Sequence, residues 1–270
     1  MQNALTDSAE DPLAFPEGWR SKKENRVTAL SERLLEKYFG NVEHPYRTFE
    51  RSVMDHLRPD CTLLDAGCGR TAPVLQKYRD KAARLIGIDL VDFDPSVVGI
   101  ELINSDLSHI DLEDSSVDLI MSRSVIEHVE DPLAVYQEMS RVLRPGGRFV
   151  FLTANLWDYA SLIARIVPNR YHPWLVSRVE GREEHDVFPI QYKSNTRRAV
   201  RKWAGSTGFE IESFQYLGQY PCYFMFNGFL FFLATGYEKL ITRFDWLAFL
   251  RGWILVVLTK PPVEQDRRHG

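Results

Sequence analysis

A short stretch of the chain, CTLLDAGCGR (61–70), joins an apolar run to an acid and two closely spaced glycines. Glycines after a buried strand let the backbone approach a ligand, and several nucleotide cofactors are bound in this way. Gly67, Gly69 and Ala72 formally satisfy the GxGxxG/A pattern of dinucleotide-binding turns. The glycines therefore predict a nucleotide-like ligand without identifying it.

Three acids help to distinguish among these ligands. Asp89 follows Gly69 at the spacing, about 20 residues, at which a carboxylate can accept hydrogen bonds from ribose hydroxyls. Asp65 stands just before the glycines, where a carboxylate would crowd a pyrophosphate but would suit a ligand with an ammonium group. Asp106 ends a later strand-like run and is placed to receive an amine such as adenine N6. Together they favour a nucleoside that carries a cationic amino acid.

The elements that must position these residues alternate along the chain. Helical patterns separate the strand-like runs, most clearly over 131–143, where Asp131 can cap the helix. Parallel strands need long connections, so this alternation predicts an α/β fold with crossover helices. Ligands of such sheets bind beyond the carboxyl ends of the strands, which is where the acids fall. The predicted strands cover 61–67, 84–90, 99–106, 117–124 and 147–155.

The flanking segments complete the predicted organisation. Helices are expected over 25–39, with Gly40 as its stop, and over 47–57, before Pro59. A helix over 196–208 and strands over 209–217 and 253–260 follow a stretch without convincing strands. The predicted regions are an arm with helices (1–58), a cofactor-binding core (59–155), an insertion or lid (156–196), the C-terminal part of the same domain (197–262) and a tail (263–270).

Composition excludes some functions. A net charge of -4 gives no basic footprint, so nucleic acid is not expected as a partner. The cysteines Cys61, Cys68 and Cys222 have neither disulfide nor metal-ligand spacing, and no metal site is expected. The REEHD run (182–186), even with His172, is more typical of a solvated charge run. The cysteine pattern favours a reducing compartment, and the cytoplasm fits best. Residues 1–19 contain acids and prolines where a signal peptide would have a basic start and an apolar core.

Segment 222–250 has more apolar residues than one helical stripe needs. Three interpretations are open: a helix buried on several sides, an apolar substrate pocket, or a surface that rests on lipid. Lys239, Arg243 and Arg251 lie where a peripheral membrane contact would place basic residues. No apolar run approaches the roughly 20 residues that cross a bilayer. The expected location is therefore cytoplasmic, and peripheral contact with the membrane surface stays open.

From 61 to 155 the chain resembles the class I S-adenosylmethionine-dependent methyltransferases of the type 11 branch. The resemblance is carried by LLDAGCG, the acid-ended LIGIDL, the stretch INSDLSHIDLEDSSVDLIMSRSVIEHVEDP and RVLRPGGRFVFLTAN. Each motif alone is weakly specific for this family, whereas the order and spacing of all four together are strongly specific. The short connection 91–99, which contains Pro95, departs from the family and predicts that the helix between the second and third strands is shortened or absent.

The resemblance implies a Rossmann-like, mostly parallel sheet of seven strands, with 209–217 and 253–260 forming a C-terminal antiparallel pair. It implies S-adenosylmethionine as the cofactor and a small-molecule or lipid-like methyl acceptor as the partner. The implied cofactor-binding residues are, from the methionine end to the adenine, Asp65, Gly67, Gly69, Ser122, Asp89, Leu90, Asp106 and Leu107.

The EHVEDP turn (127–132) carries the candidate catalytic residues. Glu127 and His128 could act as base and proton shuttle near the transferred methyl group. Alternatively, the turn only stabilises the floor of the site. Two rival functions also stay open: an NAD(P)-dependent oxidoreductase, which Asp65 disfavours, and a cofactor-binding protein without catalysis.

Overall fold

The computed structural model describes residues 28–166 and 189–262, which divide between two compact units. The core unit comprises 45–163, 188–217 and 249–270, and the helical unit comprises 1–44, 164–187 and 218–248. The expectations for residues 1–27, for most of the proposed lid including the REEHD run and His172, and for the tail lie outside the described residues.

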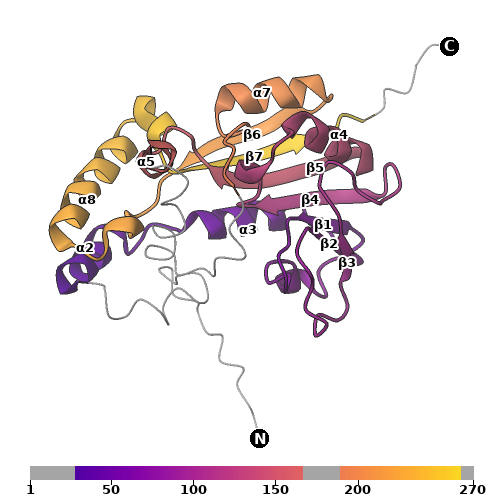
Figure 1. The fold of residues 1–270 in the computed structure, drawn as a ribbon, viewed down its shortest axis with the longest axis horizontal. Helices are drawn as coiled ribbons and strands as arrows, with labels where there is room; N and C mark the ends of the chain where they lie inside the picture. Colours follow the sequence, from indigo (N-terminus) through magenta and orange to yellow (C-terminus); the bar gives the residue numbers. More distant parts are fainter. Residues whose placement is uncertain (1–27, 167–188, 263–270) are drawn as a thin grey trace, which may run out of the picture. The chain divides into compact units, whose positions relative to one another are not determined.

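The core unit is built on a seven-stranded sheet with the order β3-β2-β1-β4-β5-β7-β6 (Figure 1). Strands β1 to β5 pair in parallel, whereas β7 is antiparallel to both β5 and β6. This confirms the predicted mostly parallel sheet with a C-terminal antiparallel pair. The strands are β1 (Thr62–Ala66), β2 (Arg84–Asp89), β3 (Glu101–Asn104), β4 (Val117–Arg123), β5 (Leu143–Ala154), β6 (Glu210–Leu217) and β7 (Trp253–Thr259).

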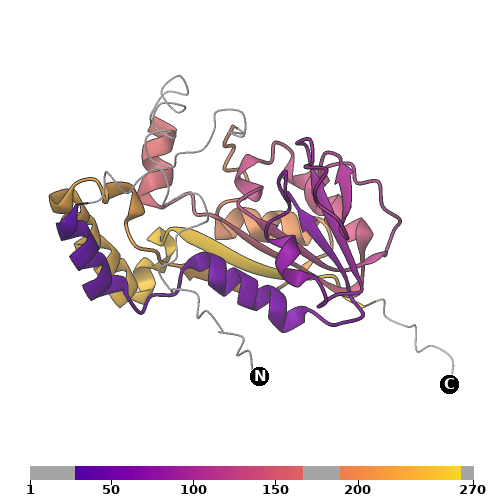
Figure 2. The ribbon, with the colours of Figure 1, turned by 90° about the horizontal axis from the view of Figure 1, so that it is seen from below.

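Helices cover both faces of this sheet. On one face lies α3 (Pro45–His56), whose Phe49 and Val53 are fully buried against alternate residues of β1, β4 and β5 (Figure 2). On the other lie α4 (Pro132–Val142) and α7 (Arg197–Ser206), which bury Tyr136 and Val200 (Figure 1). Alternate residues of a strand point to opposite faces, so the near-continuous apolar strands fill two cores.

The crossover connections differ from the simple α/β expectation. The helix α4 joins β4 to β5 as predicted, and the Asp131 side chain accepts from the amide of Ala134 at 3.2 Å. Between β1 and β2, however, the described chain has only the 3-10 helix η1 (Leu75–Tyr78). Positive φ at Ala72 and Asp80 interrupts a longer helix there. No helix joins β2 to β3, as the short connection predicts. The core unit also contains η2 (Ile126–His128) and the first part of α5 (Tyr159–Ile166), whose last three residues are assigned to the helical unit.

The helical unit pairs α2 (Ala29–Phe39) with α8 (Gly228–Arg243). The hydroxyl of Thr28 accepts from the amide of Ser31 at 3.1 Å, and α2 ends before Gly40, as predicted. Asn227 caps α8 in the same way, with its Oδ1 accepting from two amides. The short helices η5 (Cys222–Phe224) and η6 (Asp245–Leu250) flank α8. Within the described ranges, no helix is both long and apolar enough to cross a bilayer.

Candidate functional site

The loop after β1 turns on two glycines with positive φ. Gly67 (φ +90°) has no room for a side chain, because a Cβ atom there would lie 2.2 Å from Cγ2 of Val125. At Gly69 (φ +73°) an added Cβ would meet none of the described residues within 4 Å. The amide of Gly67 donates to the carbonyl of Ile88 at 2.8 Å, which ties the loop to β2. Gly67 therefore shapes the turn, while Gly69 leaves its backbone open to a ligand.

The Asp89 carboxylate organises this loop from the end of β2. Its Oδ2 accepts from the amide of Gly69 at 2.7 Å, and its Oδ1 accepts from those of Leu90 at 2.8 Å and Val91 at 3.3 Å. The side chain of Leu90 is 55 % exposed beside it. The structure thus brings together the predicted residues Gly69, Asp89 and Leu90 at one edge of the sheet.

Asp65 is a buried acid directly beneath the loop. Burial raises the pKa of its carboxyl to about 7, and Asp89 adds to this effect while the Arg123 guanidinium opposes it. Such a group exchanges its proton near neutral pH, and a cationic ligand beside it would favour the ionised form. The arrangement fits the prediction that Asp65 receives an ammonium group.

Cys68, between the two glycines, is a packing residue. Its side chain is 4 % exposed, and its sulfur lies 2.7 Å from the place that a Cβ on Gly87 would occupy. Burial raises the pKa of the thiol, which disfavours the reactive thiolate. A small side chain is therefore what this position requires.

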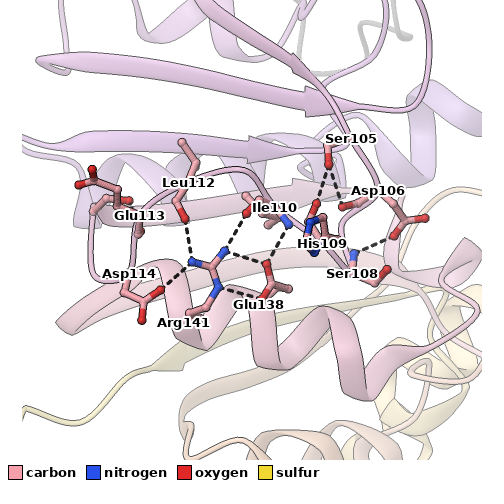
Figure 3. A network of polar contacts seen from close by, with 11 residues as sticks. Ser105, Asp106, Ser108, His109, Ile110, Leu112, Glu113, Asp114, Glu138 and Arg141 are labelled. Carbon is pink, nitrogen blue, oxygen red and sulfur yellow. Dashed lines mark hydrogen bonds and ion pairs between the residues drawn. The ribbon is translucent and has the colours of Figure 1, made fainter.

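The prediction that Asp106 ends the third strand is wrong by two residues, because β3 stops at Asn104 and Asp106 lies with Leu107 in the turn that follows. Oδ1 of Asp106 accepts from the amide of Ser108 at 2.7 Å (Figure 3). The amide of Ser105 donates to the carbonyl of Asp89 at 3.1 Å, so this turn adjoins the end of β2. Leu107 is partly buried against the core. The predicted adenine and ribose residues therefore come from adjacent strand ends.

An arginine and a glutamate on α4 hold the loop that carries Asp106 (Figure 3). Arg141 donates to the carbonyls of Ile110 and Leu112, each at 2.7 Å, and pairs with Asp114 at 2.7 Å. Glu138 accepts from the amide of Ile110 at 2.8 Å and from Arg141, whose hydrogen bond lowers the pKa of the Glu138 carboxyl. Strand patterns and motifs do not single out this pair, although the i, i+3 spacing of opposite charges in the helix is a sequence signal for it.

The end of β4 combines a buried serine with an arginine. The Ser122 side chain is fully buried, and its hydroxyl donates to the carbonyl of Ala66 at 2.7 Å. Ser122 is thus tied to the last residue of β1. The Arg123 guanidinium lies 4.3 Å from the ring centre of Tyr46 and 3.4 Å from the carboxylate of Glu50. The positive charge of Arg123 acts on Asp65 and lowers the pKa of its carboxyl, a role that strand patterns could not reveal.

Glu127 and His128 follow β4 in the helix η2. The Glu127 carboxylate is 6 % exposed and accepts from the hydroxyl of Thr153 at 2.6 Å. Its backbone carbonyl accepts from the amide of Gln191 at 2.7 Å. Nδ1 of His128 lies 3.2 Å from the carbonyl oxygen of Pro189. The turn therefore joins the end of the sheet to residues 189–192.

Asn195 extends this network, and it too was missed. Its Nδ2 donates to the hydroxyl of Thr153 at 2.8 Å and to the carbonyl of Ala154 at 2.7 Å. Thr153 thus links Glu127 to Asn195 at the carboxyl end of β5. The contact joins residues 42 positions apart, a separation at which sequence patterns carry no pairing signal.

A cavity of about 210 Å³ lies elsewhere, at the amino-terminal ends of β4 and β5. Arg144 and Arg148 line it, but they pair with Asp118 at 2.5 Å and Glu212 at 2.7 Å. Its charges are therefore balanced within the protein, and the predicted site residues do not line it. Among the residues with described positions, no cluster of His, Cys, Asp and Glu could hold a metal ion.

Comparisons with known proteins concern the same region. Residues 64–151 match the family model described as a methyltransferase domain. A probable S-adenosylmethionine-dependent methyltransferase of Mycolicibacterium smegmatis is 35% identical over 101 residues, covering 34% of this chain and 38% of the relative. The malonyl-[acyl-carrier protein] O-methyltransferase of Yersinia pestis is 36% identical over 133 residues, covering 47% of this chain and 49% of the relative. The chain thus spans less than half the length of both curated relatives.

A solved structure of geranyl diphosphate C-methyltransferase from Streptomyces coelicolor A3(2) shares the fold. It has a TM-score of 0.50 at 19% identity, over 88% of this chain and 83% of that one. At this identity the likeness concerns the fold alone. The family match supplies the remaining link, because it runs from within β1 to within β5 and includes the glycine loop with Asp65, Asp89 and Asp106. Residues 64–151 therefore form a methyltransferase domain of the class I, S-adenosylmethionine-dependent type.

Proposed function

We propose that this protein is an S-adenosylmethionine-dependent methyltransferase that acts on a small-molecule or lipid-like acceptor. The observation that carries the proposal is a row of acids at three neighbouring strand ends: the buried Asp65 at β1, Asp89 at β2 and Asp106 beyond β3. Their chemistry suits the ammonium, ribose and adenine groups of one extended ligand.

The residues present fit this cofactor. Gly69 offers an open backbone, and Asp65 is a buried acid without a closely bound cation in the hydrogen bonds and ion pairs described. Asp65 with the glycine loop and Ser122 would hold the methionine end. Asp89 and Leu90 would hold the ribose, and Asp106 and Leu107 would hold the adenine.

The cofactor would supply a methyl group on a cationic sulfur, which moves to a nucleophile by in-line displacement. The tasks of the chain are then to align the two reactants and to exclude water. A base is needed only if the acceptor must lose a proton. Glu127 and His128 are our candidates for the groups that accept that proton. The contacts with Thr153 and Asn195 would fix the position of Glu127.

The names of two relatives support the acceptor class. One acts on malonyl-acyl carrier protein and another on geranyl diphosphate, both of which combine an anionic or polar part with a carbon chain. We infer an acceptor of similar small or lipid-like character for this chain. Fold alone does not choose its nucleophilic atom.

Ligand binding tests the cofactor assignment. S-adenosylhomocysteine at about 100 times its Kd should stabilise the protein by about 2.7 kcal/mol, which raises the melting temperature by several degrees. NADH at the same concentration should leave it unchanged. A shift with NADH alone would instead favour the oxidoreductase.

Methyl transfer needs a separate assay. The protein is incubated with cofactor labelled in the methyl group and with fractionated lipid and small-molecule extracts. We expect label in one fraction for the wild type and none for Asp89→Ala. Cofactor binding without transfer to any fraction would support the non-catalytic alternative.

A further inference from the structure

The helix α8 presents an apolar surface to solvent. Its buried stripe contains Gly228, Phe231, Thr235, Glu238 and Ile241, so two polar side chains lie inside. Burial on this one stripe, with large apolar side chains exposed on the other side, shows that the interpretation of a helix buried on several sides is wrong. On α8 and the residues that flank it, the exposed fractions of six large apolar side chains are Phe226 56 %, Phe229 66 %, Phe232 54 %, Leu233 52 %, Leu240 51 % and Trp246 73 %.

We call these six side chains the apolar patch; Phe229, Phe232, Leu233 and Leu240 belong to α8, and Phe226 and Trp246 lie just before and just after it. Phe229, Leu233 and Leu240 are spaced i, i+4 and i+11, which places them on one face of the helix. Each aromatic side chain in the patch is more than half exposed and contributes on the order of 100 Å². The patch as a whole is then on the order of 600 Å², at the upper end of what a monomeric soluble protein exposes.

The partner helix within the same unit behaves differently. The exposed face of α2 carries four charged side chains, Glu32, Arg33, Glu36 and Lys37, beside a single exposed large apolar side chain, Leu30. Since α2 and α8 pack together (Figure 2), both would meet the same solvent. The apolar face of α8 is therefore a property of that helix and not of the unit.

The charges on α8 indicate what would cover the patch. Its exposed charged side chains are Lys239 and Arg243, both cationic. Its single acid, Glu238, is 1 % exposed, and the next exposed acid, Asp245, comes only beyond the end of the helix. An apolar face edged by cations complements a bilayer surface that contains anionic lipids.

The remaining features agree with a helix that lies in the membrane interface. With 16 residues, α8 is too short to span a bilayer. Trp246 is the most exposed large apolar side chain described, and tryptophan is enriched where hydrocarbon meets water. We propose that the outer face of α8 docks the protein on anionic lipid bilayers. The proposal goes beyond methyl transfer, since it concerns the helical unit by itself.

Vesicle co-sedimentation of the full chain tests it. Vesicles of phosphatidylcholine alone are compared with vesicles in which about a third of the lipid is phosphatidylglycerol. The wild type should bind the anionic vesicles at least ten-fold more tightly. The double variant F229S/L233S should lose at least ten-fold in affinity, and R243E should lose several-fold on anionic vesicles only. The matched control R33S/E36S, at exposed positions of α2, leaves the net charge unchanged and should bind as the wild type does.

The outcomes separate lipid from other partners. Unchanged far-ultraviolet circular dichroism and melting temperature show that a variant is folded. Absence of wild-type binding to both kinds of vesicle overturns the proposal. So does a concentration-dependent dimer that F229S/L233S abolishes, because the patch would then be an interface between two copies. Equal binding to neutral and anionic vesicles overturns the role assigned to the cations.

Discussion

The Oδ2 atom of Asp89 lies 2.7 Å from the backbone nitrogen of Gly69, so a carboxylate at the end of β2 holds the loop that follows β1. The acid assigned to ribose recognition therefore also shapes the neighbouring loop. Removing it should affect both the loop and the cofactor.

Asp89→Ala should weaken S-adenosylhomocysteine binding by on the order of 100-fold, because two charged hydrogen bonds to ribose hydroxyls are lost. It should also reduce the free energy of unfolding by about 1–3 kcal/mol, since three backbone amides lose their acceptor. Calorimetry and thermal melting measure the two effects. The exposed Asp92→Ala is the control and should change neither. Unchanged affinity in Asp89→Ala would remove ribose recognition from this residue.

The pKa of Asp65 predicts a pH dependence. Burial raises the folded-state pKa to about 7, above the unfolded value, so ionisation of Asp65 reduces the free energy of unfolding as pH rises from about 4 to about 7. Asp65→Asn should therefore be more stable than the wild type at neutral pH and above. A melting temperature of Asp65→Asn that falls below the wild type throughout this range would contradict the assignment.

Ionisation of Asp65, which lowers the stability of the protein, should strengthen cofactor binding. A cationic ligand favours ionised Asp65, so affinity should rise on the order of ten-fold between about pH 5.5 and about pH 7, with release of a proton. Calorimetry in two buffers of different ionisation enthalpy measures that proton. Asp65→Asn should bind weakly, with no pH dependence over this interval and no proton release.

The two glycines of the loop should respond differently to alanine. Gly67→Ala places a Cβ atom 2.2 Å from the side chain of Val125 and puts alanine at a positive φ. Together these should reduce the free energy of unfolding by about 3 kcal/mol or more. Gly69→Ala meets only the strain of its positive φ, about 1 kcal/mol, but places a methyl group where the ligand is expected. Thermal melting and ligand titration separate these effects. The double variant G67A/V125A should recover part of the stability, and equal melting temperatures for the two single variants would argue against this account.

Arg141 should act through the loop that it holds. Arg141→Met leaves the carbonyls of Ile110 and Leu112 without this donor and should cost about 2–4 kcal/mol, with weaker cofactor binding through Asp106. Arg84→Met is the matched control, because Arg84 forms an exposed pair with Glu101 worth at most about 1 kcal/mol. Equal losses of unfolding free energy in the two variants would show that the contacts of Arg141 with the loop contribute no more than an exposed ion pair.

Glu127 can be tested as a base or as a support. Glu127→Gln keeps an oxygen that can accept from Thr153 but cannot take a proton. If Glu127 handles a proton, kcat should fall at least ten-fold with unchanged S-adenosylhomocysteine affinity, and one limb of the pH–rate profile should disappear. Near wild-type rates would leave Glu127 a supporting role. His128→Gln is tested in the same way, with the exposed Glu130→Gln as the control.

The sequence by itself determined the sheet and the edge of the sheet at which the predicted cofactor residues lie. The apolar runs bounded by acids and glycines predict parallel strands, and such strands bring their carboxyl ends to one edge. Asp65, Asp89 and Gly69 could therefore be placed together from their positions in the chain alone. The short connection 91–99 likewise predicts that no helix joins β2 to β3, because too few residues are available to form one.

Only the tertiary structure decided which groups hold the site and which face of α8 meets solvent. Arg141 contacts the 110–114 loop, and Asn195 contacts Thr153, through hydrogen bonds between segments far apart in the chain. Nothing in local periodicity encodes such pairings. Periodicity also groups Phe229 with Leu233 on one side of a helix, but it does not say whether that side is covered. Packing of the opposite stripe, with Thr235 and Glu238 inside, left the aromatic side exposed.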